Sequence, residues 1–223
     1  MFSPSSKARL TAYDLGRFPS GTLFDRLGRA VCGAGCLPRK ELYEAWEVAR
    51  RVRRVFRGGR VVDLGGGHGL LAQVLLLLDD SSPAALVVDT APPALAAKLH
   101  AALVDAWPRL AGRVAFVEGR LEATPLSGAD LVVSCHACGA LTDVVLDRAV
   151  AAGARVAVLP CCHDPVTCDA SALTGWVDAA LAIDVTRVAR LEQQGYRVRT
   201  QTIPREITPK NRLLMGEPQP GAP

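Results

Sequence analysis

The sequence has few aromatic residues and lacks both a membrane-length apolar run and a hydrophobic leader. Aromatic side chains make up 5% of its 223 residues. The longest apolar runs, such as residues 74–78, fall far short of the roughly 18 residues that a membrane span needs. The start, MFSPSSKAR, has no apolar core of the kind found in secretory signals. We therefore expect a cytoplasmic protein that makes no contact with a membrane.

The cysteines do not form the pattern of a disulfide framework. There are seven, an odd number, at Cys32, Cys36, Cys135, Cys138, Cys161, Cys162 and Cys168. In a chain without a leader, they indicate reduced thiols, a metal site or chemistry. The composition, with 49% apolar and 22% charged residues, is typical of a globular protein. Its net charge of +4 permits an RNA partner without requiring one.

Beyond residue 60 the chain alternates short β-rich runs with helical runs, which predicts a parallel sheet covered on both faces. Residues 1–37 are expected to be irregular, because prolines and glycines interrupt any long pattern. Pro38 then opens an arginine-rich helix over 38–57. Strands are expected at 60–63, 86–89, 114–118, 130–134 and 155–160, and helices at 70–78, 93–110, 141–151 and 173–194.

The end of the chain differs from this alternation. Residues 196–203 and 211–216 read as two strands, and the linker PREITPK between them is too short for a crossover helix. They should therefore pair antiparallel. We predict an α/β fold with a mainly parallel seven-stranded sheet, a C-terminal antiparallel hairpin and helices on both faces. The main domain is expected over 38–217, followed by a disordered tail at 218–223.

The segment RVVDLGGGHGLL at 60–71 reads as a strand ending in an acid, a glycine turn and the start of a helix. Gly65, Gly67 and Gly69 fall at alternate positions, and Gly66 fills one gap. Glycine adopts a positive φ without strain and lets a ligand approach the backbone. A strand, loop and helix in this order present backbone N–H groups to a polar ligand. The segment therefore predicts a nucleotide-type pocket.

The register of the glycines decides which ligand is expected. A dinucleotide fingerprint needs glycine where this chain has Leu70, and the Gly-Lys-Ser/Thr of a phosphate-binding loop is absent. The form Asp-Leu-Gly-Gly-Gly-His-Gly resembles motif I of the Rossmann-like S-adenosylmethionine (SAM) methyltransferases. The resemblance implies SAM as cofactor, with Asp63 and the glycines beside its methionine moiety. A structural glycine turn in another α/β domain is the alternative, and Leu70 with the terminal hairpin disfavours a nicotinamide oxidoreductase.

Further cofactor contacts are expected at the ends of the other strands. Asp89 lies 20 residues past Gly69 at the end of the second strand, a distance that suits hydrogen bonds to ribose hydroxyls. Arg120 and Leu121 follow the third strand and are expected to border the adenine. Ser134 and Cys135 end the fourth strand at the same edge of the sheet.

Two unusual Cys/His segments follow the fourth and fifth strands. The pattern His-Ala-Cys-Gly-x-x-Thr-Asp at 136–143, followed by Pro-Cys-Cys at 160–162, resembles the eukaryotic tRNA 2′-O-methyltransferases with a CHHC finger. It is also similar to methyltransferase domains fused to a glutathione-transferase-like domain. The resemblance covers about 37–216, includes Ile-Thr-Pro-Lys-Asn-Arg at 207–212, and implies an RNA nucleotide as acceptor. No CHHC finger is found here, and a small molecule or a protein side chain is the alternative acceptor.

These segments supply the candidate catalytic and substrate-binding residues. His136 is a candidate base, because a neutral imidazole accepts a proton near pH 7; holding the loop is its alternative role. Cys138 and Asp143 complete the catalytic set, and Asp143 is alternatively a helix cap or an orienting group for His136. The candidate substrate-binding residues are Arg50, Arg54, Cys161, Cys162, Lys210, Asn211 and Arg212. The arginines are alternatively a solvated helix face.

A zinc site is the competing interpretation of the Cys/His segments. Cys135, Cys138, Cys161, Cys162 and His163 offer enough ligands for a tetrahedral ion. Adjacent cysteines do not easily place both thiolates on one ion, so we predict no metal ligands. A binding module with a degenerate methyltransferase fold and a Cys/His zinc site is therefore the alternative function.

Overall fold

The computed structural model, which describes residues 3–219, is built on a seven-stranded sheet in the order β3-β2-β1-β4-β5-β7-β6. The strands are β1 (Val61–Leu64), β2 (Ala85–Asp89), β3 (Val114–Glu118), β4 (Leu131–Ser134), β5 (Arg155–Val158), β6 (Tyr196–Thr202) and β7 (Arg212–Pro218). Strands β1 to β5 are parallel, and β7 pairs antiparallel with both β5 and β6. The predicted fold class, with its terminal hairpin, is confirmed.

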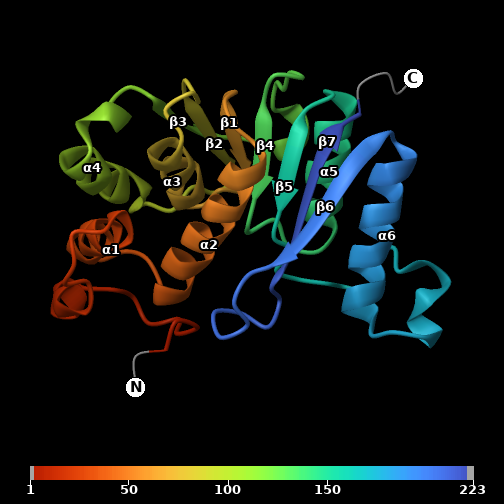
Figure 1. Cartoon of the computed structure of the whole chain (residues 1–223), viewed down its shortest axis with the longest axis horizontal. Coiled ribbons are helices and arrows are strands. Elements are labelled where there is room, and N and C mark those ends of the chain that lie inside the picture. The colour runs from red at the N-terminus through yellow and green to blue at the C-terminus, as the bar shows by residue number, and fades with distance from the viewer. Residues whose placement is uncertain (1–2, 220–223) are drawn as a thin grey trace.

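Helices cover both faces of the sheet. Helices α1 (Leu23–Ala34), α2 (Arg39–Val55), α3 (Leu70–Leu78) and α4 (Ala96–Ala106) pack on one face, and α5 (Ala140–Ala151) and α6 (Ala179–Gln193) on the other. Figure 1 shows the first four gathered at the left and α6 beside β6 and β7 at the right. In the part of the chain that the structure describes, no helix is both long and apolar enough to cross a bilayer.

Strand β1 shows why the central strands read as continuous apolar runs. Its four residues are all buried, because parallel strands are covered on both faces. Successive side chains point to opposite faces. Val61 therefore joins the core under α1 to α4, while Val62 and Leu64 join the core under α5 and α6.

From the sequence, residues 1–37 were expected to be irregular. The structure differs, because this segment contains helix α1. Thr22 caps this helix by accepting a hydrogen bond from the Asp25 N–H at 3.3 Å, and Gly35 ends it with a φ of 65°. Glycines inside the helix hid the pattern. Gly28 is needed there because a Cβ at this position would lie 2.3 Å from the Phe18 ring. The N-terminal segment thus belongs to the core.

The last helix also differs from the expectation. It was expected from residue 173 but begins at Ala179, where the Asp178 side chain accepts a hydrogen bond from the Leu181 N–H at 3.0 Å. Ser171–Gly175 forms a short 3₁₀ turn instead. The expected disordered tail lies largely outside the described residues, and its first residue, Pro218, is the last of β7.

Candidate functional site

A pocket of about 370 Å³ lies at the carboxyl edge of the parallel strands. This is the edge at which open α/β sheets bind ligands. Its walls come from the ends of four strands: Gly65 and Gly67 after β1, Asp89 and Thr90 at β2, Arg120 and Leu121 after β3, and His136 and Ala137 after β4. The structure therefore brings five of the ten residues that the sequence proposed for the cofactor to the walls of this pocket. Thr90, Glu122, Ala137 and Leu141 also line the pocket and were missed; Ala137 lies within the His-Ala-Cys-Gly segment, but an alanine carries no side-chain chemistry that marks it.

The conformation of the loop after β1 requires its glycines. Gly65, Gly67 and Gly69 have φ values of 69°, 52° and 71°, in the left-handed region that favours glycine. Gly66 is needed for space, because a Cβ there would lie 2.7 Å from Val87 and 2.8 Å from the Asp63 carboxyl carbon. The loop is consequently a bare backbone surface that a ligand can approach closely.

On the sequence alone, the N–H groups of this loop were expected to be free for a ligand. Those of Gly65, Gly66 and Gly67 are instead already hydrogen-bonded within the protein. Gly65 and Gly66 donate to the Val88 carbonyl at 2.8 and 3.2 Å, and Gly67 donates to Asp89 Oδ2 at 3.0 Å. Asp89 Oδ1 also accepts from the Ala91 N–H at 3.0 Å. An ionised carboxylate offers about four acceptor sites. Asp89 therefore holds the loop in place and still has lone pairs for ribose hydroxyls.

Asp63 lies buried beneath the loop, and its Oδ2 atom has no hydrogen-bond partner. Burial raises the pKa of Asp63 to about 7, and the nearby Asp89 charge acts in the same direction. An unpartnered buried oxygen of this kind favours a donor or a cation above it. The amino group of a methionine moiety fits that requirement, so the site fits SAM.

His136 lies where this pocket meets a smaller cavity beneath the loop, which Asp63 and Cys135 also line. Its side chain reaches solvent at the mouth of the pocket. Protein atoms packed around the ring, together with the Lys40 ammonium group, nevertheless lower the pKa of His136. The imidazole is therefore neutral at pH 7 and able to accept a proton.

Ser134 and Cys135 support the pocket from behind its wall. Ser134 Oγ donates to the Leu64 carbonyl at 2.6 Å and accepts from the Ala137 N–H at 3.2 Å, which ties β4 to the end of β1. Cys135 is buried, and burial raises its pKa. Neither lies among the residues that line the larger pocket.

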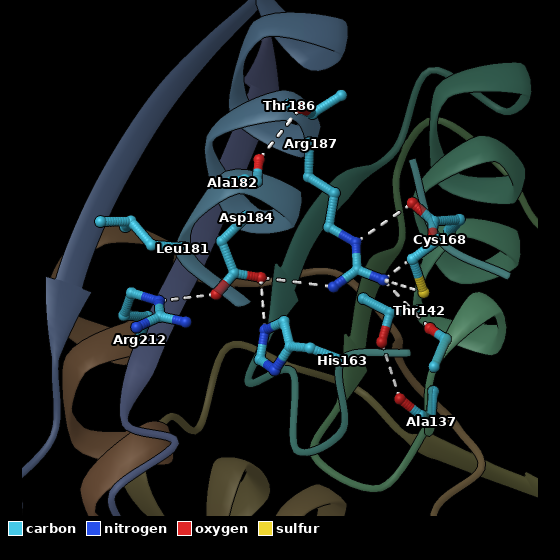
Figure 2. Close-up of polar contacts among 12 residues, drawn as sticks. Ala137, Thr142, His163, Cys168, Leu181, Ala182, Asp184, Thr186, Arg187 and Arg212 are labelled. Atoms are coloured by element: carbon cyan, nitrogen blue, oxygen red, sulfur yellow. Dashed lines mark hydrogen bonds and ion pairs between the residues drawn. The ribbon is translucent and has the colours of Figure 1, made fainter. Parts of the chain in front are cut away.

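Asp143 belongs to a charge network, and among the described residues it makes no hydrogen bond or ion pair with His136. Its carboxylate accepts from Arg187 at 2.7 and 3.1 Å and from Arg190 at 3.2 Å. Arg187, which is 1% exposed, also donates to the Gly139 carbonyl at 3.0 Å. Figure 2 shows its guanidinium group reaching from α6 toward the turn before α5. Neither alternative for Asp143 is seen in the described part of the chain, because Gly139 is the N-cap of α5 without a side-chain cap; the carboxylate instead anchors two arginines of α6.

Asp184 continues this network on the other side of Arg187. Its carboxylate contacts Arg187 at 3.3 Å, His163 Nε2 at 2.8 Å and Arg212 Nε at 2.6 Å (Figure 2). The network thus joins the three segments that carry the family resemblance. Arg212, a candidate substrate-binding residue, is held in this network by Asp184. Asp184 and Arg187 could not be identified from the sequence, because they lie inside a helix with no motif around them.

Some of the neighbouring candidate substrate-binding residues also have structural partners. Asn211 donates to the Ile203 carbonyl at 2.7 Å and so closes the hairpin of β6 and β7. Lys210 is exposed, and its ammonium group makes no hydrogen bond or ion pair within residues 3–219. Cys161 and Cys162 follow β5 and lie beside Cys138, with 3.2 Å between the sulfur atoms of Cys138 and Cys161.

The end of α2 that carries Arg50 and Arg54 lies away from the pocket. Arg50 pairs with Glu47 at 3.3 Å, while Arg54 is exposed. Arg53 of the same helix is buried and donates to the Leu75 carbonyl at 3.1 Å. This end of α2 leads into the start of β1, at the edge of the sheet opposite the glycine loop. The structure therefore does not bring Arg50 and Arg54 to the pocket.

Comparison with known proteins agrees with this geometry. A family model described as a methyltransferase domain matches residues 40–169. No curated protein matches the sequence.

Several solved structures share the fold. The mitomycin 7-O-methyltransferase MmcR is 22% identical, with a TM-score of 0.54 over 94% of this chain and 63% of that one. A putative O-methyltransferase from Nostoc punctiforme is 16% identical (TM-score 0.53; 92% and 67%). The tRNA methyltransferase TrmK of B. subtilis is 14% identical (TM-score 0.52; 78% and 66%). The chain thus spans less than two thirds of MmcR, and at these identities the likeness concerns the fold alone.

Proposed function

The chain belongs to the family of SAM-dependent methyltransferase domains, and from this premise we propose that it transfers the methyl group of SAM to an acceptor beside His136. The observation that carries the proposal is the pocket at the carboxyl edge of the sheet. Its floor is a bare glycine loop over the unpartnered Asp63 oxygen, and its wall holds the Asp89 carboxylate.

Four residues of the site have defined roles in cofactor binding in this proposal. Asp89 accepts hydrogen bonds from the ribose hydroxyls, and Asp63, which lines the smaller cavity beneath the loop, stabilises the amino group. Arg120 and Leu121 border the adenine. SAM, when bound, supplies an electrophilic methyl group. The protein contributes mainly by aligning the acceptor with that methyl group, an orientation effect that alone lowers a barrier by several kcal/mol, about 7–11 at most.

We infer that His136 removes a proton from the acceptor as its methyl bond forms. Replacing His136 with alanine is then expected to lower kcat by about 100-fold, the usual contribution of a positioned base. Since the pKa of His136 is lowered, the base stays neutral and active below pH 6.5. A pH–rate profile of the wild type, with its acid limb below that value, checks this.

The control for this variant is His100→Ala, because His100 is bonded to Gln73 at 2.8 Å and does not line the pocket. It should keep the wild-type kcat and pH profile. An equal fall in both variants, or an unchanged rate in His136→Ala, would remove His136 from the reaction.

We propose an RNA nucleotide as the acceptor. Among the solved structures, one methyltransferase is named for tRNA and another for the small molecule mitomycin, so their names do not choose between the classes. The lysines favour an anionic acceptor. Lys210 is exposed, and Lys40 is close enough to His136 to influence its charge. A small-molecule acceptor is the second candidate.

A methyl-transfer assay with radiolabelled SAM against fractionated RNA, protein and metabolites tests the acceptor. Label is expected in RNA, and Lys210→Gln is expected to reduce that label by about tenfold, the effect of one lost phosphate contact of roughly 1.4 kcal/mol. Lys98→Gln removes an equal charge from the exposed side of α4 and should leave the label unchanged. Label found only in small molecules would establish the second candidate.

A further inference from the structure

Three cysteine thiols converge beside the pocket from two separate segments. Cys138 lies in the turn between β4 and α5, and Cys161 and Cys162 follow β5. The sulfur atoms of Cys138 and Cys161 are 3.2 Å apart, those of Cys161 and Cys162 are 3.8 Å apart, and all three lie within 4.8 Å of one another. Strands β4 and β5 are neighbours in the sheet, which brings the two segments together.

These thiols differ from the other cysteines in their exposure. Cys138 is exposed, and Cys161 and Cys162 are partly exposed. The remaining four cysteines, which are Cys32, Cys36, Cys135 and Cys168, are buried. A free cysteine that serves as a small apolar side chain is normally buried. The three clustered thiols therefore need another explanation than core packing.

Their spacing matches the ligand shell of a thiophilic ion. Zinc binds thiolates at about 2.3 Å in tetrahedral geometry, which places two sulfur ligands about 3.8 Å apart. The separations in this cluster lie around that value. The adjacent pair Cys161 and Cys162 was expected not to place both thiolates easily on one ion, but its two sulfur atoms lie 3.8 Å apart and both lie within 4.8 Å of the Cys138 sulfur.

We propose that Cys138, Cys161 and Cys162 bind one zinc ion and leave its fourth position open to solvent. The thiols release their protons to water as the ion binds, and no oxidation or reduction occurs. Three thiolates and a divalent ion carry a net charge of −1. The exposed Lys210 acts electrostatically on the Cys162 sulfur, so positive charge is already placed to offset this site.

The other candidate ligands of the sequence analysis lie outside the cluster. Cys135 is buried in the cavity beneath the glycine loop. His163 is held by Asp184 through Nε2 at 2.8 Å, and its ring nitrogens do not lie within 4.8 Å of all three sulfur atoms. Zinc sites with three protein ligands and an open position are typical of catalysis, whereas structural sites have four. The cluster is thus suited to an exchangeable ligand.

Cobalt(II) titration of the full chain tests this proposal. Protein freed of metal by a chelator is titrated under reducing conditions, and the thiolate-to-cobalt charge-transfer absorption is recorded. We expect one ion per chain, displaced by added zinc. Each of Cys138→Ser, Cys161→Ser and Cys162→Ser should weaken binding by at least about 100-fold, because a lost ligand costs more than the roughly 10–100-fold effect of an outer-shell partner.

The matched control is Cys36→Ala, which removes a buried thiol outside the cluster. It should bind cobalt as the wild type does, with circular dichroism reporting the fold of every variant. Absence of charge-transfer absorption in the reduced wild type would overturn the proposal. So would absorption that survives in all three cluster variants, or a Cys138–Cys161 disulfide that re-forms in place of metal uptake. Since the measurement involves no methyl transfer, its failure is distinct from failure of the proposed activity.

Discussion

Replacing Asp89 with alanine is expected to weaken binding of SAM and S-adenosylhomocysteine by about 100-fold. The carboxylate both fixes the Gly67 N–H of the loop at 3.0 Å and faces the pocket at the end of β2. A hydrogen bond to a charged group contributes about 1.5–3 kcal/mol, and each 1.4 kcal/mol is tenfold in affinity. Alanine removes the contact to the ribose and loosens the loop, so the effect should reach the upper part of that range.

Isothermal calorimetry with S-adenosylhomocysteine measures this change. The control is Asp105→Ala, because Asp105 is an exposed acid on α4 outside the pocket. It should bind as the wild type does. Asp89→Asn keeps an acceptor for Gly67 but loses the charge, so its affinity should fall between the two. Wild-type affinity in Asp89→Ala would show that the cofactor binds elsewhere.

Replacing Arg187 with methionine is expected to lower the free energy of unfolding by about 3–5 kcal/mol. Removing one partner of a buried ion pair leaves the other charge without compensation, which has this magnitude. Arg187 is 1% exposed and lies between Asp143 at 2.7 Å and Asp184 at 3.3 Å. Its loss would leave an apolar side chain beside both carboxylates, but Arg190 still pairs with Asp143 and Arg212 with Asp184, so we expect a loss at the lower end of this range.

Urea unfolding followed by circular dichroism measures this loss, and Arg190→Met is a closely matched control. Arg190 pairs with the same Asp143 at 3.2 Å, but its side chain is 40% exposed. Exposed pairs contribute at most about 1 kcal/mol, so this variant should be nearly neutral. Equal losses in the two variants would mean that burial does not decide the strength of this network.

The network around Arg187 explains why three separate motifs occur together in this chain. Asp143 belongs to the segment after β4, His163 follows β5, and Arg212 begins β7. Each contacts either Arg187 or Asp184 of α6. Together, these contacts dock α6 and the terminal hairpin onto the segments that border the pocket. Part of the signature that resembles a methyltransferase family is therefore structural support rather than reacting groups.

The parts of the fold that local physics dictates were predicted from the sequence. The strands were recognised to within two residues at each end, because apolar runs bounded by glycine, proline and acids are local signals. Helix α1 was missed because Gly28 interrupts its pattern, and only the Phe18 ring packed against it explains that glycine. The burial of Arg53 could not be predicted, because helix periodicity does not reveal a partner such as Asp79, at 3.1 Å, in a later loop.

By itself, the sequence determined the glycine loop at the floor of the pocket, because the conformation of this loop is a backbone property of one short segment. Glycines at 65, 67 and 69 supply the left-handed turns, and Leu70, where a dinucleotide fingerprint needs glycine, disfavours a dinucleotide. Only the tertiary structure decided the partners of Asp143, the direction of the arginine helix and the meeting of Cys138 with Cys161 and Cys162. These depend on which strands are neighbours and which helix covers them, and contacts between distant segments leave no periodic trace in the chain.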